Sequence, residues 1–311
     1  MQVYRDIEHL PPFRNAILTI GTFDGVHIGH CQILHQMLEE ARFVNGTPVV
    51  ITFFPHPKQV VRKNDKPVNV LNTPEEKYAL LHSKGIEHIV VVPFDTRFAE
   101  QLPSVYIEEF LVKKFHPHTI IIGYDHRFGK NREGDYHLLE NAAIQMGFTV
   151  KEIPEHILEN VIISSTKIRD ALKTGNIAMA NEFLGYAYFF TGTVIHGNEL
   201  GRTIGFPTAN ILIDDKDKLV PGNGVYAVKV KVEGLEHSYN GMLNIGVRPT
   251  VDGINTVIEV NIFEFDEDIY DRKITVTLFQ RIRSEIKFNG LEALKEQLVK
   301  DRLAALAALE N

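Results

Sequence analysis

The chain has 311 residues, 44% of them hydrophobic, and a formal net charge of −7 at pH 7. That length exceeds the size at which one hydrophobic core usually keeps growing, so it predicts two domains. The acidic balance disfavours a dedicated nucleic-acid binder, and no stretch approaches the roughly 18 uncharged apolar residues that cross a membrane. Cys31 is the only cysteine, which excludes intramolecular disulfides and thiolate zinc sites. We expect a cytoplasmic protein without a signal peptide.

The first half of the chain alternates short β-rich runs with amphipathic helical patterns. Apolar runs with the length and β-branched content of buried parallel strands lie at 16–23, 49–54, 89–92, 119–122 and 148–153. Helical patterns lie between them at 33–43, 74–84 and 104–115. The helix at 74–84 begins with an N-cap threonine, a first-turn proline and a capping-box glutamate. This alternation predicts an α/β domain with a doubly wound parallel sheet.

The pattern changes near residue 187. Strand-like runs at 188–195, 225–233, 237–246, 256–264 and 273–283 are separated by turns rich in Gly, Pro and Asn. Only one good helical pattern follows, at Leu291–Leu309. These features predict a small antiparallel β-barrel with a C-terminal helix packed on it. We therefore expect one domain over residues 1–186 and a second over residues 187–311.

The first candidate site is the segment 21–30, which follows the first strand and leads into the first helix. Parallel sheets bind ligands at such turns, and the start of a helix favours phosphate. Gly25 and Gly29 would let the backbone approach a nucleotide closely. His27 and His30, three residues apart, would project from one face of the helix and donate hydrogen bonds to the phosphates of ATP. The alternative is that both are surface or capping residues.

A second phosphate-binding pattern lies at residues 164–169, Ser-Ser-Thr-Lys-Ile-Arg. Ser164 or Ser165 can cap a helix, and the hydroxyl and N–H groups at that end suit phosphate oxygens. Arg169, one turn further, offers a guanidinium for bidentate phosphate contact. By itself the segment is explained as well by a plain N-cap with an exposed arginine. Its combination with the histidine turn favours the phosphate interpretation.

The second half carries its own candidate site. A run with several glycines precedes Pro-Thr-Ala-Asn at 207–210, but it lacks the Gly-Lys-Ser/Thr ending of a P-loop. Thr208 and Asn210 offer oxygen ligands suited to Mg²⁺, and they point the same way if the stretch is extended. The alternative, a strand start with solvated polar residues, stays open. Glu259 alternates with the apolar Ile258 and Val260, so it can equally be a solvent-facing glutamate.

Together these segments resemble the bacterial bifunctional riboflavin kinase/FAD synthetases, over nearly the whole chain and in that family's order. The run Gly-Thr-Phe-Asp-Gly-Val-His-Ile-Gly-His at 21–30 is similar to the nucleotide-binding signature of the adenylyltransferase superfamily. Further FAD synthetase motifs are matched at 52–57, 123–129 and 163–169. Riboflavin kinase motifs are matched at 205–210, 224–226, 244–250 and 258–263.

The resemblance implies two reactions, each with MgATP as co-substrate. The second domain would phosphorylate riboflavin to FMN, and the first would adenylylate FMN to FAD with release of pyrophosphate. Glu259 would accept the proton of the ribityl hydroxyl, while His27, His30 and Arg169 would neutralise charge in adenylyl transfer. The nucleotide-binding residues would be Gly21, Phe23, Asp24, Gly25, Gly29, Ser164, Ser165, Thr166, Gly197 and Gly205. The flavin-binding residues would be His56, Asp125, Arg283 and Phe288, and the Mg²⁺ ligands Thr208 and Asn210.

The chain departs from the family pattern at two places, and two rival functions remain. His126 replaces a usual Phe, and Tyr-Asp-Arg at 270–272 replaces Tyr-Gly-Lys. A class I aminoacyl-tRNA synthetase shares the short His-x-Gly-His signature, but the short acidic chain and the missing Lys-rich second signature disfavour it. A non-catalytic flavin carrier would bind flavin without consuming ATP. We expect small-molecule substrates, no nucleic-acid partner and no membrane partner; the oligomeric state stays open.

Overall fold

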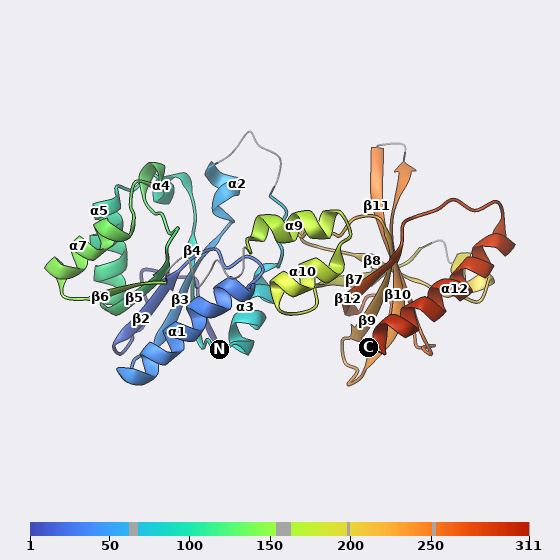
Figure 1. Cartoon of the computed structure of the whole chain (residues 1–311), viewed down its shortest axis with the longest axis horizontal. Helices are drawn as coiled ribbons and strands as arrows, with labels where there is room; N and C mark the ends of the chain where they lie inside the picture. The colour runs from blue at the N-terminus through green and yellow to red at the C-terminus, as the bar shows by residue number, and fades with distance from the viewer. Residues whose placement is uncertain (62–67, 154–162, 198–199, 251–252, 311) are drawn as a thin grey trace. The chain divides into compact units, whose positions relative to one another are not determined.

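The computed structural model describes residues 1–61, 68–153, 163–197, 200–250 and 253–310. The chain forms two compact units, Met1–Ser165 and Thr166–Asn311. Figure 1 shows the elements of both, and each unit is described by itself.

The first unit is built on a six-stranded sheet in the order β1-β4-β3-β2-β5-β6, in which every neighbouring pair is parallel. The strands are β1 (Gln2–Tyr4), β2 (Ala16–Ile20), β3 (Pro48–Phe54), β4 (His88–Pro93), β5 (Pro117–Gly123) and β6 (Thr149–Ile153). The predicted parallel sheet is confirmed. The short edge strand β1 was not predicted, because three residues carry too little periodicity to recognise.

Helices cover both faces of this sheet. Alternate strand residues such as Ile17 and Val50 pack against α1 (Ile28–Phe43) and α3 (Pro74–Ser83). The other set, which includes Leu18 and Ile51, packs against the segment 106–115 and the helix α7 (Tyr136–Met146). The predicted helix at 104–115 consists of α5 (Pro103–Val105), a π-helical stretch η1 (Tyr106–Val112) and α6 (Lys113–Phe115). Shorter elements are α2 (Pro57–Val61), α4 (Thr96–Ala99) and η2 (Lys130–Arg132).

The strand order sets the position of the first candidate site. Chain order reverses between β2 and β5, which lie side by side at the centre of the sheet. Ligands bind to open α/β sheets at the carboxyl ends of the strands next to such a reversal. The segments 21–30 and 123–129 follow β2 and β5 at this edge.

The second unit contains a closed barrel in the order β10-β11-β8-β7-β12-β9, and every neighbouring pair within it is antiparallel. The strands are β7 (Phe189–Ile195), β8 (Ala209–Leu212), β9 (Gly224–Val232), β10 (Ser238–Thr250), β11 (Gly253–Ile262) and β12 (Lys273–Arg283). Buried residues alternate with more exposed ones along β7 and β12, as a filled barrel requires. The predicted barrel is confirmed. The four-residue β8 was read from the sequence only as a possible strand start.

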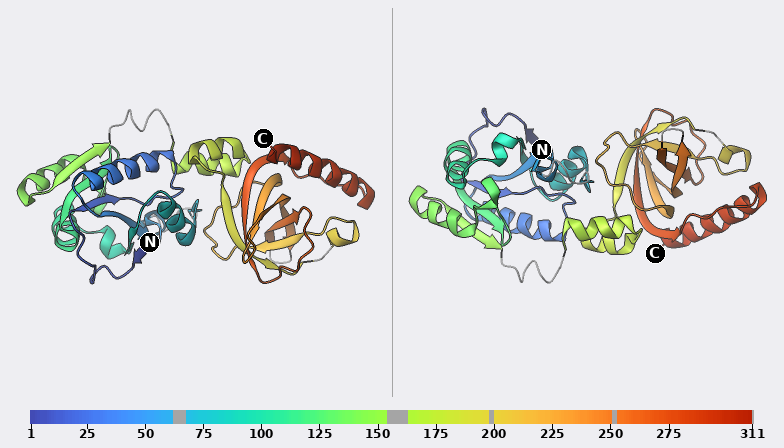
Figure 2. Two further views of the ribbon diagram at one scale, coloured as in Figure 1. Left: turned by 90° about the horizontal axis from the view of Figure 1, so that it is seen from below. Right: turned by 90° about the horizontal axis from the view of Figure 1, so that it is seen from above.

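Four helices among the described residues pack on the barrel or connect to it. The helix α12 (Leu291–Leu309) has the predicted bounds, and its buried Ala305 packs against Val225, Ala227 and Met242. Figure 2 shows α12 along the outside of the barrel. The helices α9 (Ser165–Lys173) and α10 (Ile177–Leu184) precede the first barrel strand, and Asn181 Nδ2 donates to the Leu278 carbonyl at 3.0 Å. The single turn α11 (Leu200–Thr203) lies before β8.

Candidate functional sites

The histidine turn has the geometry of an anion-binding helix start. His27 is the N-cap of α1, and its Nδ1 accepts a hydrogen bond from the backbone N–H of His30 at 3.4 Å. The two imidazole rings are stacked, with centroids 3.7 Å apart and an interplanar angle of 16°. The capping role left open by the sequence is therefore real for His27. Because the cap places both rings at the positive end of the helix dipole, capping and phosphate binding are compatible.

The backbone before α1 is strained. Phe23 and the β-branched Val26 both adopt positive φ, 48° and 37°, on either side of Gly25 with φ 89°. Such conformations cost about 1–3 kcal/mol each for residues other than glycine and persist where the surroundings enforce them. Phe23 and Val26 are almost fully buried, so the core enforces this turn. The turn is thereby shaped before any ligand arrives.

The second phosphate pattern meets the first through a hydrogen bond. Ser165 Oγ donates to the backbone carbonyl of Asp24 at 2.9 Å, which joins the start of α9 to the turn before α1. Asp24 is buried, and its Oδ1 accepts from the backbone N–H of Leu71 at 2.8 Å. Its carboxylate therefore shapes the turn. Ser164 and Thr166 are exposed on either side of Ser165, and Arg169 is buried on α9 within the second unit.

Electrostatics favours a neutral His30. Burial, assisted by nearby His27 and Lys77, lowers the pKa of His30 well below its usual range. Its Nδ1 is buried and has no hydrogen-bond partner among the residues that the structure describes. A neutral imidazole can donate from one nitrogen, so at neutral pH His30 would act on phosphate as a hydrogen-bond donor without a charge of its own.

Two side chains that sequence reasoning did not single out complete this region. Lys77 Nζ donates to Thr52 Oγ1 at 3.1 Å and to the Thr22 carbonyl at 3.3 Å. Thr52 Oγ1 donates to the same carbonyl at 3.2 Å. Lys77 follows the capping-box glutamate on α3, and nothing in its spacing distinguishes it from a solvated lysine. Only the fold brings it under the turn.

The predicted flavin-binding residues of the first unit lie after β3 and β5, at the same edge of the sheet. His56 Nδ1 accepts from the Lys58 backbone N–H at 3.2 Å, at the start of α2. Asp125 is exposed in the turn after β5. His126, in the place of the family's Phe, tilts against Phe128 with ring centroids 5.9 Å apart. Burial, with a smaller effect of Arg132, lowers the pKa of His126 to about 4, so the imidazole is neutral and packs as an aromatic ring.

The barrel brings the second set of predicted residues together. Asn210 on β8 and Glu259 on β11 are directly opposite each other, and Asn244 on β10 is opposite Glu259 on its other side. Opposite residues of antiparallel strands share a face. Asn210, Glu259 and Asn244 therefore form a polar row across three strands, opposite in orientation to Ile258 and Val260. Asn244 was quoted only within a motif, and its place in this row follows from the strand register.

The glycine-bearing run covers the same row. A Cβ added to Gly197 would lie 2.0 Å from Asn210 Nδ2, so a larger residue there would displace the Asn210 amide. A Cβ on Gly201 would lie 3.4 Å from Thr208 Oγ1, and Gly205 adopts φ 82°. Asn261, two residues after Glu259, donates from Nδ2 to the Pro207 carbonyl at 2.6 Å and fixes the Pro-Thr-Ala-Asn segment on β11. Residues 198–199 of the glycine-bearing run lie outside the described residues.

Arg283 is bound within the barrel unit. Its Nη2 donates to Asp301 Oδ2 on α12 at 2.7 Å, its Nε lies 2.9 Å from Asp301 Oδ1, and its guanidinium lies 5.6 Å from the Phe288 ring centroid. The Asp301 side chain is only 1% exposed. The structure thus gives Arg283 a bidentate ion pair that fastens the C-terminal helix, while its flavin-binding role stays a prediction.

Asp271, where the family has glycine, adopts φ 61°, a left-handed conformation that aspartate tolerates better than most residues.

The ion pair between Arg283 and Asp301 should stabilise the barrel unit. We expect Asp301→Ala to lower the free energy of unfolding of the barrel unit by about 3–5 kcal/mol, because the substitution leaves a largely buried guanidinium unpaired. Urea denaturation followed by circular dichroism and by loss of riboflavin phosphorylation measures the effect. Lys300→Ala, at an exposed neighbouring position on α12, is the control. An Asp301→Ala midpoint equal to that of the control would contradict the prediction.

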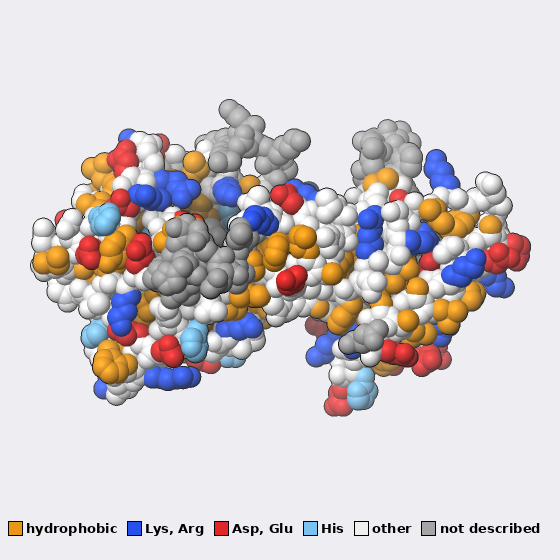
Figure 3. Space-filling view, in the orientation of Figure 1, with side chains coloured by type: hydrophobic (Ala, Val, Ile, Leu, Met, Phe, Trp, Pro, Cys, Tyr) orange, Lys and Arg blue, Asp and Glu red, His pale blue; other side chains and the backbone are white. Residues whose placement is uncertain are grey.

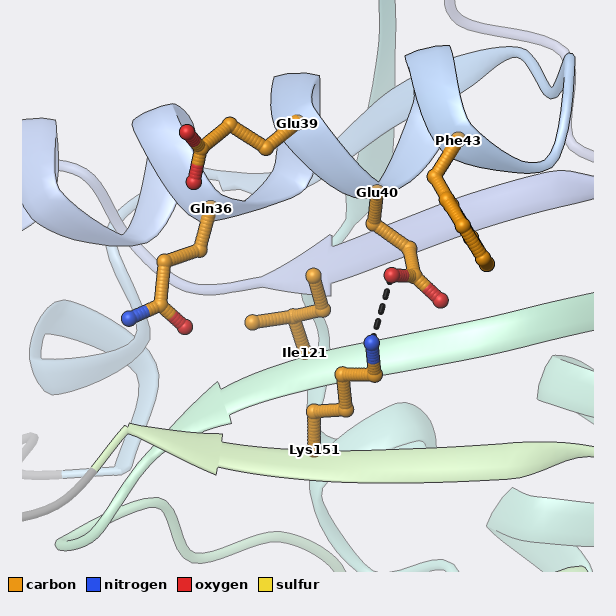
Figure 4. A pocket seen from close by; sticks show the side chains of 6 residues that line it. All are labelled: Gln36, Glu39, Glu40, Phe43, Ile121 and Lys151. Carbon is orange, nitrogen blue, oxygen red and sulfur yellow. Dashed lines mark hydrogen bonds and ion pairs between the residues drawn. The ribbon is translucent and has the colours of Figure 1, made fainter.

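A separate hollow lies away from the helix start. It has a volume of about 270 Å³ and lies beside the second half of α1, where it is lined by Gln36, Glu39, Glu40, Phe43, Ile121 and Lys151 (Figure 4). Lys151 Nζ and Glu40 Oε2 form an ion pair at 2.5 Å across it. Burial alone would raise the pKa of Glu40, but the hydrogen bond from Lys151 lowers it overall. The acidic lining makes this hollow unsuitable for nucleotide phosphates.

Each unit thus has a place suited to nucleotide phosphates, and this puts the chain among the nucleotide-dependent transferases. Residues 11–167 match the family model described as FAD synthetase, and residues 184–309 match the one described as riboflavin kinase. The chain belongs to the family of bifunctional riboflavin kinase/FMN adenylyltransferases. Proteins of that name from Haemophilus influenzae and Escherichia coli K12 are each 40% identical to it, over 93% and 98% of this chain and 92% and 97% of their own. One from Bacillus subtilis is 36% identical over 95% of this chain and 93% of its own.

A solved structure agrees in fold over both units. A chain titled as a macrolide-efflux protein from Streptococcus pneumoniae superposes with a TM-score of 0.86, at 29% identity, and the match covers 98% of each chain. Its title differs in function from the names of the curated relatives. In the part of this chain that the structure describes, no helix is long and apolar enough to cross a membrane.

Proposed function

We propose that the family's two reactions are divided between the two sites described above. FMN adenylylation takes place at the histidine turn of the first unit, and riboflavin phosphorylation takes place at the polar row of the barrel. ATP and flavins are the substrates of this family of enzymes. The observation that carries the proposal is the pairing of Asn210 with Glu259 across β8 and β11, which joins two predicted kinase residues that are far apart in sequence.

In the barrel, Glu259 accepts the proton of the ribityl terminal hydroxyl while that oxygen attacks the γ-phosphorus of ATP and ADP leaves. Glu259 is half-buried, so its carboxylate is held by its strand and remains within reach of substrate. Asn244, next to it in the row, is placed to orient the flavin hydroxyls or the nucleotide. The glycine-bearing run covers the phosphates with backbone N–H groups.

Thr208 and Asn210 fit a magnesium ion only as partial ligands. They supply neutral oxygen donors, and Mg²⁺ usually completes its octahedron with waters and substrate phosphates. Among the residues that the structure describes, no group of three His, Cys, Asp or Glu side chains could hold a metal ion by itself. The ion would neutralise phosphate charge during transfer. Thr208 and Asn210 would fix its position relative to Glu259.

In the first unit, the phosphate of FMN attacks the α-phosphorus of ATP and pyrophosphate leaves. The attacking phosphate is already anionic, so no strong base is needed, and catalysis depends on positioning and charge neutralisation. His27, His30 and the N-terminal N–H groups of α1 hold the ATP phosphates. Ser165, at the end of this unit, adds a hydroxyl. The phosphate-binding role predicted for Arg169, in the second unit, stays a prediction. His56, Asp125 and the neutral His126 border the flavin.

The test is separation of flavins by chromatography after incubation with MgATP. Riboflavin should give FMN and then FAD, and FMN alone should give FAD. A flavin carrier would leave flavin and ATP unchanged. An aminoacyl-tRNA synthetase would retain tRNA without flavin turnover. On the face shown in Figure 3, side chains of both charges are present on each unit. A cytoplasmic location and the oligomeric state stay predictions to be tested separately.

The domain boundary expected at 186/187 is tested with fragments, because the compact units divide at 165/166 and group α9 and α10 with the barrel. The helices α9 and α10 contact the barrel through hydrogen bonds such as Gly222 N to Leu172 O at 2.9 Å and Asn181 to Leu278. We expect fragment 166–311 to make FMN. Fragment 187–311 should also make FMN but melt at a lower temperature, by about 3–5 °C for each kcal/mol of lost contacts. Equal melting temperatures would show that α9 and α10 do not stabilise the barrel.

A further inference from the structure

A half-buried cation, Lys77, contacts the nucleotide turn of the first unit. Lys77 comes from α3, whose start is fixed by a complete capping box in which Thr73 and Glu76 exchange hydrogen bonds. Its Nζ donates to the backbone carbonyl of Thr22, which follows Gly21 in the turn. It also donates to the hydroxyl of Thr52, near the end of β3. These two contacts use two of the three ammonium protons. Three elements, α3, β3 and the turn before α1, therefore converge on one charge.

Among the described residues, one carboxylate, that of Asp24, interacts electrostatically with this charge. Asp24 is the carboxylate that acts on Lys77, and it already accepts hydrogen bonds from the backbone N–H groups of Leu71 and Asn72. Tyr78, the next residue, has its ring centroid 5.9 Å from Lys77 Nζ. Burial lowers the pKa of the Lys77 ammonium to about 8, and Asp24 opposes part of that shift. A lysine that is costly to keep charged, beside a pair of histidines, indicates a place where negative charge arrives.

The pKa of His30 is affected by the same positive charge. Lys77 is among the groups that lower the pKa of His30, so the two side chains interact electrostatically. His30 Nδ1 is the buried nitrogen that has no partner in the described part of the chain. With His30 neutral, Lys77 is the cation that the described residues of the first unit place directly at this turn. A triphosphate bound at the start of α1 would therefore lie close to this charge as well as to the two histidines.

We propose that Lys77 is a positioning residue for FMN adenylylation, which braces the turn through Thr22 and supplies a fixed positive charge that favours binding of the ATP phosphates. The inference rests on the proposed assignment of adenylyl transfer to this site. Lys77 acts through the turn and through its field, and it does not take part in bond making. A purely structural lysine would make the same hydrogen bonds, but its charge would not affect the affinity for ATP.

The experiment compares Lys77→Met, Lys77→Arg and Lys84→Met, with both reactions measured on each purified full-length protein. Lys84→Met removes an exposed lysine at the end of the same helix and is the matched control. We expect Lys77→Met to raise the KM for ATP in FAD formation by about tenfold or more, the size of effect that one charge exerts in a partly buried site. Lys77→Arg should keep most of the wild-type KM. Riboflavin phosphorylation, the internal reference, should change in none of them.

A pH profile separates charge from structure. The ammonium is charged below its folded pKa of about 8 and neutral above it, so the wild-type KM for ATP in FAD formation should rise as the pH passes 8. Lys77→Arg stays charged and should show a flatter profile. Two other titratable groups lie near Lys77, and the shifts of both move them away from this range: burial raises the pKa of Tyr78, and burial lowers that of His30 well below its usual range.

The outcomes distinguish the inference from the assignment on which it rests. Wild-type protein that makes no FAD from FMN and MgATP would overturn both. Wild-type protein that makes FAD, together with an unchanged KM in Lys77→Met, would overturn the role of Lys77 alone. Equal losses in Lys77→Met and Lys77→Arg with superposable pH profiles would reduce Lys77 to a structural brace. If Lys77→Met fails to fold, the profiles of the wild type and Lys77→Arg decide the matter.

Discussion

Glu259→Gln should abolish riboflavin phosphorylation and leave FMN adenylylation intact. The substitution keeps the size and polarity of the side chain but removes the carboxylate that accepts the proton, and loss of a general base typically costs about 10²–10⁴ in rate. The strand should be undisturbed, because Ile258 and Val260 on the opposite face carry its packing. Initial rates of FMN formation from riboflavin and of FAD formation from FMN measure the two activities separately.

The control for this variant is Glu264→Gln, a carboxylate just beyond the end of β11 and outside the polar row. It should leave both rates unchanged. Parallel loss of phosphorylation and adenylylation in Glu259→Gln would contradict two independent sites. An unchanged phosphorylation rate would show that another residue is the general base. Glu259 would then be the solvent-facing glutamate that the sequence also allows.

The double variant His27→Ala/His30→Ala should have the reverse effect. Each imidazole that contacts phosphate is expected to be worth about 10²–10³ in the rate of FAD formation, as for other donors to developing charge. Riboflavin phosphorylation should persist, so FMN should accumulate. Flavin chromatography over time distinguishes accumulation of FMN from loss of all turnover.

A capping effect must be separated from a catalytic one here. Removal of the His27 N-cap alone costs about 0.5–2 kcal/mol of stability, which a folded domain can tolerate. His27→Asn restores a capping side chain without an imidazole, so it should recover thermal stability but not FAD formation. Recovery of full activity in His27→Asn would show that His27 acts only as the cap.

The sequence predicts the long elements of the fold better than the short ones. The doubly wound sheet followed from long, strongly patterned runs, and the helix at Leu291–Leu309 matched because its periodicity was unbroken. The strand β1 was not predicted, and β8 was read only as a possible strand start. Three or four residues are too few to show an alternating hydrophobic pattern. The capping box at Thr73 was confirmed at atomic level because local chemistry alone defines it.

The candidate sites show the same division. Motif residues such as His27, Thr208 and Glu259 were identified because their types and order carry a signal. Lys77 and Asn244 were not, because each acquires its surroundings only from tertiary structure: one from the approach of α3 to the turn, the other from strand register. Arg283 differs from both. The sequence motif predicts that it binds flavin, and in the structure its guanidinium also holds α12 in place through Asp301.

Strand register in the barrel has a consequence for how the kinase half could fail. Side chains alternate between the two faces of a strand, so a shift of β11 by one position would exchange Glu259 for Ile258 or Val260 beside Asn210. The same shift would turn the buried Ile258 and Val260 away from the core, so the barrel would lose stability together with its polar row. A shift by two positions would keep the faces but bring Val257 or Asn261 beside Asn210 in place of Glu259, so the polar row exists in this one register alone.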